Sequence, residues 1–296
     1  MASTIGEWSG FWAVYAFLRL AFDRPTRFAF EDRINWKIGG LMALNRCIMI
    51  SGASSGLGAA LALKYADADT TLFLTGRNEE RLKSAADACA QKGAKVYIQI
   101  LDVTDAGAVS AWVADVSAEM PIDLVIANAG VLQTHDKDRV LESADKAWQQ
   151  VSTNVGGVIN FLTAVAPYMQ TRKKGHVALI SSLSALQPLA DLPAYSGSKA
   201  AVVAYGEAMR AYLHEDNVLV SVICPGYIKT PMTDVRENWR PFQMSADEAA
   251  TLIKRALDDK KGFYAFPWPM VIATRLGRLL PWKLRRHVTA AFNYRR

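Results

Sequence analysis

The stretch IMISGASSGLG at residues 48–58 decides the fold. Three apolar residues typical of a strand lead into a glycine-rich turn, which opens into a helix-like segment at residues 59–66. Glycines at positions 52, 56 and 58 let the backbone turn sharply and approach a pyrophosphate, whose negative charge the first helical turn favours. A glycine-rich stretch alone fits an ordinary loop. A strand before it and a helix after it favour a dinucleotide-binding turn.

Apolar runs alternate with longer amphipathic stretches along the chain, a pattern typical of βαβ units around a parallel sheet. We therefore predict an α/β fold, doubly wound in the Rossmann manner, with a mostly parallel seven-stranded sheet. Its strands are expected at residues 46–51, 70–75, 95–100, 122–127, 176–181, 217–223 and 262–266. A ligand would then lie across the carboxyl ends of these strands.

Tyr195 and Lys199 stand four residues apart in the run AYSGSK at residues 194–199, so a helix there would place both on one face. A free tyrosine has a pKa near ~10, and a fixed cation nearby favours the phenolate and makes the group a proton carrier. The same spacing also occurs on solvated helix faces. The glycine turn upstream favours the catalytic interpretation of this pair over a solvated helix face.

These motifs together resemble the short-chain dehydrogenase/reductase family over residues 46–265. The resemblance rests on the glycine turn at 51–58, Asp102-Val103, Asn128-Ala129-Gly130, Ser182 thirteen positions before Tyr195, and Pro225-Gly226 with Thr230. It implies a catalytic tetrad of Asn154, Ser182, Tyr195 and Lys199. It also implies cofactor contacts from Ser51, Gly52, Ser54, Ser55, Gly56, Leu57, Gly58, Arg77, Asp102, Val103, Asn128, Ala129, Gly130, Tyr195, Lys199, Pro225, Gly226, Ile228 and Thr230.

Three residues depart from the family pattern. Ser51 replaces the usual threonine and keeps its hydroxyl. Ala127 replaces a second asparagine, so we expect one hydrogen bond to the central sheet to be missing. Gly197 replaces an alanine in the expected active-site helix, at a helix-propensity cost of about 0.5–1 kcal/mol.

The end of the second expected strand bears on the choice of nicotinamide cofactor. An acidic residue there would bind the adenosine ribose and repel a 2′-phosphate, whereas an arginine can pair with that phosphate. The chain has Leu74-Thr75-Gly76-Arg77, which favours NADP(H) with Arg77 as the phosphate partner. Glu79 and Glu80 leave open a simple surface ion pair instead.

The expected reaction is hydride transfer between the nicotinamide and a carbonyl or alcohol carbon. Tyr195 would supply the proton while Ser182 donates a hydrogen bond to the same substrate oxygen. Lys199 would lower the pKa of Tyr195, and the resemblance implies that it also binds the nicotinamide ribose and reaches solvent through water held by Asn154. Alternatively, Ser182 caps a strand end and Asn154 is an ordinary polar helix residue.

The two ends of the chain are expected to be extensions of a catalytic domain at residues 46–266. Residues 1–45 are rich in aromatic residues, and residues 267–296 form a basic amphipathic segment without acidic residues. Similar termini occur in family members that resemble this chain and act at membranes. The extensions could contact a membrane, the domain itself or a partner subunit. A cytoplasmic location, with the inner face of a membrane as the alternative, is the expectation.

The substrate is the least determined part of the prediction. Residues 231–244 resemble the family's variable lid and carry Met232, Trp239, Phe242 and Met244, which favours a hydrophobic or acyl-chain carbonyl compound. A sugar or polyketide intermediate is the alternative. In another functional class, the chain is a non-catalytic NADP-binding scaffold or regulator.

No metal, nucleic-acid or disulfide chemistry is expected. The three cysteines and four histidines are scattered without ligand spacing, and buried thiols in a reducing compartment account for the cysteines. The fold offers a more obvious ligand than nucleic acid, although the formal net charge is +6. Family resemblance implies a homodimer or homotetramer.

Overall fold

The structure is a computed structural model that describes residues 46–133, 141–232, 240–281 and 283. The expectations for the aromatic extension at 1–45, for most of the loop tip around Trp239, and for the end of the basic extension lie outside these residues. The proposed domain boundaries therefore remain predictions.

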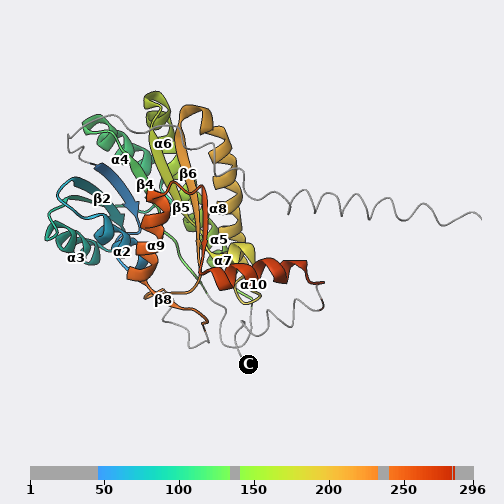
Figure 1. Ribbon diagram of the computed structural model, residues 1–296. Helices are drawn as coiled ribbons and strands as arrows, with labels where there is room; N and C mark the ends of the chain where they lie inside the picture. The colour runs from blue at the N-terminus through green and yellow to red at the C-terminus, as the bar shows by residue number, and fades with distance from the viewer. Residues whose placement is uncertain (1–45, 134–140, 233–239, 282, 284–296) are drawn as a thin grey trace, which may run out of the picture. The chain divides into compact units, whose positions relative to one another are not determined.

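Seven strands form one parallel sheet in the order β3-β2-β1-β4-β5-β6-β9 (Figure 1). The chain reverses its winding direction between β1 and β4, which places a crevice at the carboxyl ends of these two strands. The strands are β1 (Arg46–Ser51), β2 (Thr70–Gly76), β3 (Lys95–Ile100), β4 (Leu124–Ala127), β5 (Gly175–Ile180), β6 (Val218–Pro225) and β9 (Phe263–Phe266). The predicted α/β fold and parallel sheet are confirmed.

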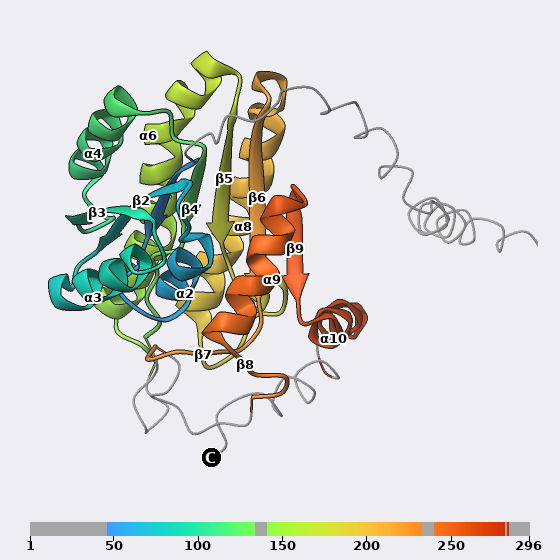
Figure 2. The same ribbon diagram turned by 60° about the vertical axis from the view of Figure 1, so that its left-hand side comes forward.

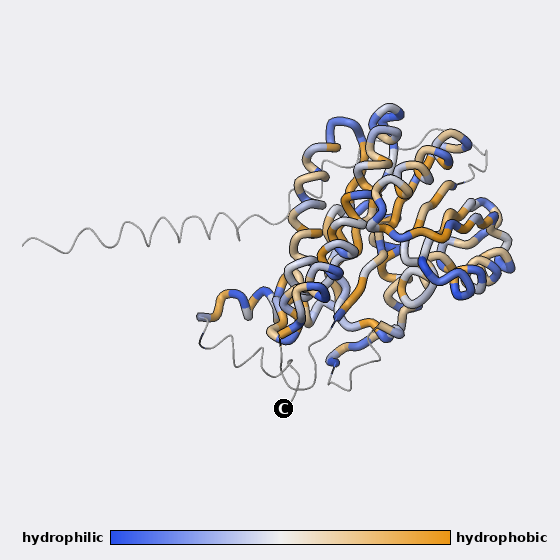
Figure 3. The backbone as a smooth tube through the Cα atoms, turned by 180° about the vertical axis from the view of Figure 1, so that it is seen from behind, coloured by the Kyte–Doolittle hydropathy of each residue, from blue (hydrophilic) through white to orange (hydrophobic). Residues whose placement is uncertain are grey.

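Helices cover both faces of the sheet, and the central strands contribute side chains to both layers. On β1, Ile48 and Ile50 pack toward one face while Cys47 and Met49 pack toward the other, because strand side chains alternate. Figure 3 shows the central strands as hydrophobic throughout, as expected for a parallel sheet that is buried on both faces.

The first face carries α2 (Gly56–Tyr65), α3 (Glu79–Ala90) and α9 (Ala246–Asp258). The second carries α4 (Ala106–Glu119), α6 (Gly157–Arg172) and α8 (Pro193–Tyr212). Smaller elements lie between them: α5 (Ala144–Val151), the π-helix η2 (Ser152–Gly156), α7 (Leu183–Leu186), the 3-10 helix η3 (His214–Asp216), and the short strands β7 (Ile228–Lys229) and β8 (Met244–Ser245). The last helix, α10 (Trp268–Leu279), follows β9.

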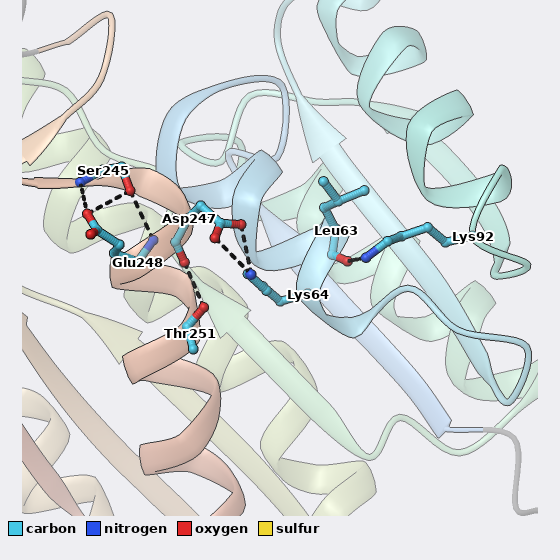
Figure 4. Close-up of polar contacts among 7 residues, drawn as sticks. All are labelled: Leu63, Lys64, Lys92, Ser245, Asp247, Glu248 and Thr251. Atoms are coloured by element: carbon cyan, nitrogen blue, oxygen red, sulfur yellow. Dashed lines mark hydrogen bonds and ion pairs between the residues drawn. The ribbon is translucent and has the colours of Figure 1, made fainter.

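Polar contacts fix the ends of α2 and α9, which pack on one another (Figure 4). Ser245 and Glu248 form a reciprocal capping box that satisfies backbone N–H groups at the start of α9. In the last turn of α2, Lys64 forms an ion pair with Asp247, at 2.8 Å from Oδ1. The cation lies at a helix C-terminus and the anion at a helix N-terminus, so the pair also suits both helix dipoles.

The buried cysteines agree with the composition-based expectation. Cys47, Cys89 and Cys224 are all free and buried, and burial raises the pKa of the Cys89 thiol to about 11. Within the described residues, no three His, Cys, Asp or Glu side chains cluster in a way that could hold a metal ion.

Two glycines on α8 give a matched test of how this helix packs. Gly197 is exposed and a Cβ there would meet no heavy atom within 4 Å, so Gly197→Ala should raise the free energy of unfolding by about 0.5–1 kcal/mol. Gly206 is buried, and its Cβ would lie 2.5 Å from Val222 Cγ2, so Gly206→Ala should lower it by about 1–3 kcal/mol. Urea denaturation measures both. Destabilisation by both substitutions would show that the helix does not pack as described.

Candidate active site

A pocket of about 520 Å³ runs along the carboxyl ends of the strands. In Figure 2 the arrowheads of β5 and β9 point to this edge, near β7 and β8. Nearly all the residues expected at the site line the pocket: Gly52, Ser54, Ser55, Gly56, Leu57, Gly58, Arg77, Asp102, Val103, Asn128, Ala129, Gly130, Ser182, Tyr195, Lys199, Pro225, Gly226, Ile228 and Thr230. Ser51 and Asn154 do not line it and lie behind its wall.

The glycine turn forms one end of the pocket and leaves no room for side chains. A Cβ on Gly58 would lie 2.1 Å from the Gly52 carbonyl oxygen, and Gly52 itself has a φ of +68°. Ser55 precedes α2 without a side-chain cap, so no side chain there satisfies the N–H groups of the first turn. These N–H groups and the bare glycine backbone fit a pyrophosphate.

Ser51 and Asn128 join the glycine turn to the loop after β4. Ser51 Oγ accepts hydrogen bonds from the backbone N–H groups of Asn128 and Ala129, at 3.0 and 3.1 Å. Asn128 Nδ2 donates in return to the carbonyl oxygens of Ser51 and Gly52, at 3.1 and 3.3 Å. Ala127 is buried and has no side-chain donor, but these four bonds hold the two loops together without one.

Asn154 positions the far wall of the pocket from inside the π-helix η2. Its Oδ1 accepts from the Val131 N–H at 2.7 Å, and its Nδ2 donates to the Val131 carbonyl and to Ser198 Oγ, both at 3.0 Å. A Cβ on Gly130 would lie 3.1 Å from Asn154 Oδ1 and 3.4 Å from Lys199 Nζ. Asn154 is thus a fully buried bridge from the β4 loop to α8, and not an ordinary polar helix residue.

Tyr195 and Lys199 share one face of α8, as the spacing predicted. Lys199 Nζ lies 5.9 Å from the centre of the Tyr195 ring and donates to the Ile180 carbonyl at 2.9 Å. Burial lowers the pKa of Lys199 to about 8, partly opposed by Cys224. Burial raises the pKa of Tyr195, and the hydrogen bond with Ser182 opposes the rise.

The pKa of Tyr195 is therefore raised overall, and not lowered as expected for a phenol beside Lys199. The ammonium group donates to the Ile180 carbonyl, and desolvation of the phenol outweighs its hydrogen bond with Ser182. A raised pKa keeps the proton on Tyr195. The phenol is thus held in the form that acts as a general acid.

The structure separates Ser182 from its neighbouring serine. Ser182 Oγ accepts from the Ser184 N–H at 3.1 Å at the start of α7 and also takes part in the bond with Tyr195. Ser181 instead donates to the Lys199 carbonyl at 2.7 Å, so its hydroxyl stabilises α8. Ser182 therefore both caps a helix and contacts the phenol.

A basic group forms the other end of the pocket, beside the end of β2. Arg77 lies 3.8 Å from Asp102 Oδ2, and both side chains are well exposed. Glu79 pairs instead with Lys83 at 2.7 Å. The carboxylate beside Arg77 is therefore that of Asp102, and not that of Glu79 as the sequence had left open. Burial raises the pKa of Asp102, but hydrogen bonds from Thr104 and the charge of Arg77 lower it overall.

The sequence analysis missed several residues of the site. Arg81 lies one turn into α3 and lines the pocket with Arg77, while Asn78 caps α3 by accepting from the Arg81 N–H at 2.9 Å. The asparagine cap followed by an arginine three residues later was the available signal. Other pocket-lining residues that were not predicted are Gly76, Leu101, Val131, Thr153, Ile180 and Ser181, whereas Pro231 and Met232 belong to the predicted lid at residues 231–244.

Glu142 was also missed, and it holds the start of α8. Its Oε1 accepts from the Ala194 N–H at 2.9 Å, one residue before Tyr195, while its Oε2 accepts from Gln150 Nε2. Gln150 is fully buried and its Oε1 accepts from the Gln133 N–H at 3.0 Å. This chain of bonds ties the loop after β4 to the first turn of the helix that carries Tyr195.

Residues 46–241 match the family model described as short chain dehydrogenase. The chain belongs to the short-chain dehydrogenase family. Its members are oxidoreductases that use NAD or NADP, in agreement with the glycine turn at one end of the pocket and Tyr195 in its wall.

Relatives of this short-chain dehydrogenase agree with the assignment. An uncharacterized oxidoreductase of Myxococcus xanthus is 35% identical over 241 residues, which cover 80% of this chain and 93% of the relative. A 3-oxoacyl-[acyl-carrier-protein] reductase of Chlamydia muridarum is 32% identical over 65% of this chain and 77% of its own length. A short-chain dehydrogenase from Sphingobium yanoikuyae, solved in complex with NADPH, shares the fold at a TM-score of 0.69 and 23% identity, over 79% of this chain and 95% of that one.

The lowered pKa of Lys199 predicts a pH dependence of stability. Because the folded protein gives up this proton near pH 8 and the unfolded chain near ~10.4, the burial penalty is present below pH 8 and is relieved as the pH rises. The free energy of unfolding of the wild type, relative to Lys199→Met, should increase by about 2 kcal/mol between pH 8 and 10. Denaturation curves at several pH values measure it. Parallel pH profiles for the two proteins would contradict the lowered pKa.

Proposed function

We propose that this chain is an NADP(H)-dependent oxidoreductase that transfers hydride between the nicotinamide and the carbonyl or alcohol carbon of a hydrophobic substrate. One observation carries the proposal. Tyr195, in hydrogen-bond contact with Ser182 and backed by the buried Lys199, lies in the same pocket as the glycine cradle at the start of α2.

The residues of the pocket divide the work of the reaction. A bound nicotinamide dinucleotide supplies or accepts the hydride. During reduction, negative charge develops on the substrate oxygen, and Ser182 donates a hydrogen bond to it. Tyr195 holds its proton firmly and releases it to this oxygen as the charge develops. Lys199 stands next to the phenol and favours the phenolate that remains.

Two arginines support the choice of NADP(H). Arg77 and Arg81 both line the end of the pocket beside β2, where a 2′-phosphate of the adenosine ribose would lie in this fold. Asp102 partly neutralises Arg77, but the ion pair is long and exposed and leaves the guanidinium donors accessible.

An apolar approach to the pocket supports a hydrophobic or acyl-chain carbonyl substrate. Met232 lines the pocket and is partly exposed, and Phe242 is exposed on the same loop. The Chlamydia muridarum relative is named for an acyl-chain substrate, which favours this class over a polar sugar. We also keep the sequence-based prediction of a homodimer or homotetramer, in which each subunit would carry one such pocket.

Replacement of Tyr195 tests the catalytic assignment. Tyr195→Phe removes the acid without removing the ring, so NADPH-dependent turnover should fall on the order of 10²–10⁴-fold while NADPH affinity stays within about twofold. Tyr205→Phe on the same helix is the matched control, because Tyr205 packs into the core and should keep full activity. Substantial turnover by Tyr195→Phe would contradict the scheme, and a wild type that binds NADPH without reducing any of a broad carbonyl panel would favour the scaffold alternative.

Replacement of Arg77 tests the cofactor assignment. Arg77→Ala should weaken NADPH binding about tenfold or more and leave NADH binding nearly unchanged, because the guanidinium is proposed to pair with the 2′-phosphate. Lys83→Ala removes an exposed cation from the neighbouring helix α3 and should change neither affinity. Fluorescence titration with both dinucleotides measures the preference. Equal or tighter binding of NADH by the wild type would overturn the assignment.

A further inference from the structure

The last helix of the structure, α10, has one face against the pocket wall and another face exposed. Met270 and Val271 pack with Leu183 of α7 and Cys224 of β6, close to the Ser182 turn. On the neighbouring loop, a Cβ on Gly226 would lie 3.3 Å from Met270 Sδ, and Gly226 itself lines the pocket. The inner face of α10 therefore supports the wall of the substrate end of the pocket.

The outer face of α10 carries a stripe of large apolar side chains. Trp268, Ile272, Leu276 and Leu279 are 72%, 48%, 60% and 76% exposed. At 3.6 residues per turn these four positions fall within about 80° of the helix surface. Figure 3 shows the resulting alternation of hydrophobic and hydrophilic residues along this helix. Such a contiguous apolar stripe is unusual on a free soluble surface and indicates a binding face.

The charges on this face select the partner. Arg275 lies about 20° outside the edge of the stripe at Trp268 and Arg278 about 80° outside it, and both side chains are exposed. Lys283 follows four residues after Leu279, and residues 260–296 contain no Asp or Glu. Long cationic side chains beside Trp and Leu suit an anionic lipid surface, because their stems lie along the apolar layer while their heads reach the phosphates.

The length of α10 limits how it can meet a bilayer. Twelve residues span about 18 Å at 1.5 Å per residue, short of the ~30 Å hydrocarbon core. More generally, the described part of the chain contains no helix that is long and apolar enough to cross a membrane. A helix of this length and pattern lies in the interfacial plane.

We propose that α10 docks the enzyme on an anionic lipid surface through Trp268, Ile272, Leu276 and Leu279, with Arg275 and Arg278 contacting lipid phosphates. Because the opposite face of α10 supports the pocket wall, docking brings the substrate end of the pocket close to the bilayer. A carbonyl lipid could then enter from the membrane. Only this last step rests on the proposed function, since docking itself requires neither cofactor nor substrate.

Vesicle flotation of the full chain tests the docking face. The wild type should float with vesicles of 30 mol% phosphatidylglycerol in phosphatidylcholine and bind pure phosphatidylcholine about tenfold more weakly. Leu276→Asp/Leu279→Asp should weaken binding to the anionic vesicles about tenfold or more. Arg275→Gln/Arg278→Gln should remove most of the preference for the anionic lipid. In each variant, an unchanged free energy of unfolding and unchanged NADPH binding show that the domain is intact.

Two exposed tryptophans provide a matched control. Trp268→Ala should weaken vesicle binding severalfold, whereas Trp148→Ala on α5, where the side chain is 66% exposed, should leave it unchanged. Full vesicle binding by Leu276→Asp/Leu279→Asp would overturn the proposal and place the contact elsewhere in the chain. Failure of the wild type to bind, with an oligomer that this double variant dissociates in sedimentation, would overturn it in favour of a subunit contact.

Discussion

The site depends on the close approach of two backbone segments at the crevice between β1 and β4. Gly58 lies so near the Gly52 carbonyl that a single added carbon would collide with it, and the Asn128 amide fills the remaining space with bonds to Ser51 and Gly52. These contacts set the direction of α2, and with it the direction of its uncapped N–H groups. They also fix the loop that leads to Gly130 and Asn154, so the phosphate end and the catalytic end of the pocket share one support.

Burial controls the chemistry at the other end. Lys199 is buried and Tyr195 is half-buried, and desolvation favours the neutral form of each, through a raised pKa of the phenol and a lowered pKa of the amine. Neutral tyrosine is the form that donates a proton, and Lys199, with a pKa of about 8, is still mostly cationic near pH 7, so its charge favours the phenolate that remains. A positive group fixed beside an already ionised phenol would have favoured proton abstraction instead. The environment of the pair matters as much as its spacing.

The sequence predicted the sheet and most of the site because both follow from local rules. Buried parallel strands appear as continuous apolar runs, and glycines that tolerate no side chain stand at fixed offsets. The sequence therefore predicted the residue ranges of β1, of the turn at 52–58 and of the helix that carries Tyr195. What escaped prediction depends on contacts between distant segments. The bond from Glu142 to the Ala194 N–H joins residues 52 apart, and the pKa of Tyr195 is set by desolvation from several elements. Arg81 lines the pocket because α3 starts immediately after Asn78, which places Arg81 in the first turn of this helix.

The central claim is that one pocket holds a dinucleotide between the glycine cradle and the Tyr195 hydroxyl. A crystal structure of the full chain with NADPH tests this most directly. The account predicts the pyrophosphate against the N–H groups at the start of α2, the 2′-phosphate beside Arg77 and Arg81, and the nicotinamide ring next to Tyr195 and Lys199. A dinucleotide bound elsewhere, or a nicotinamide ring turned away from Tyr195, would contradict it.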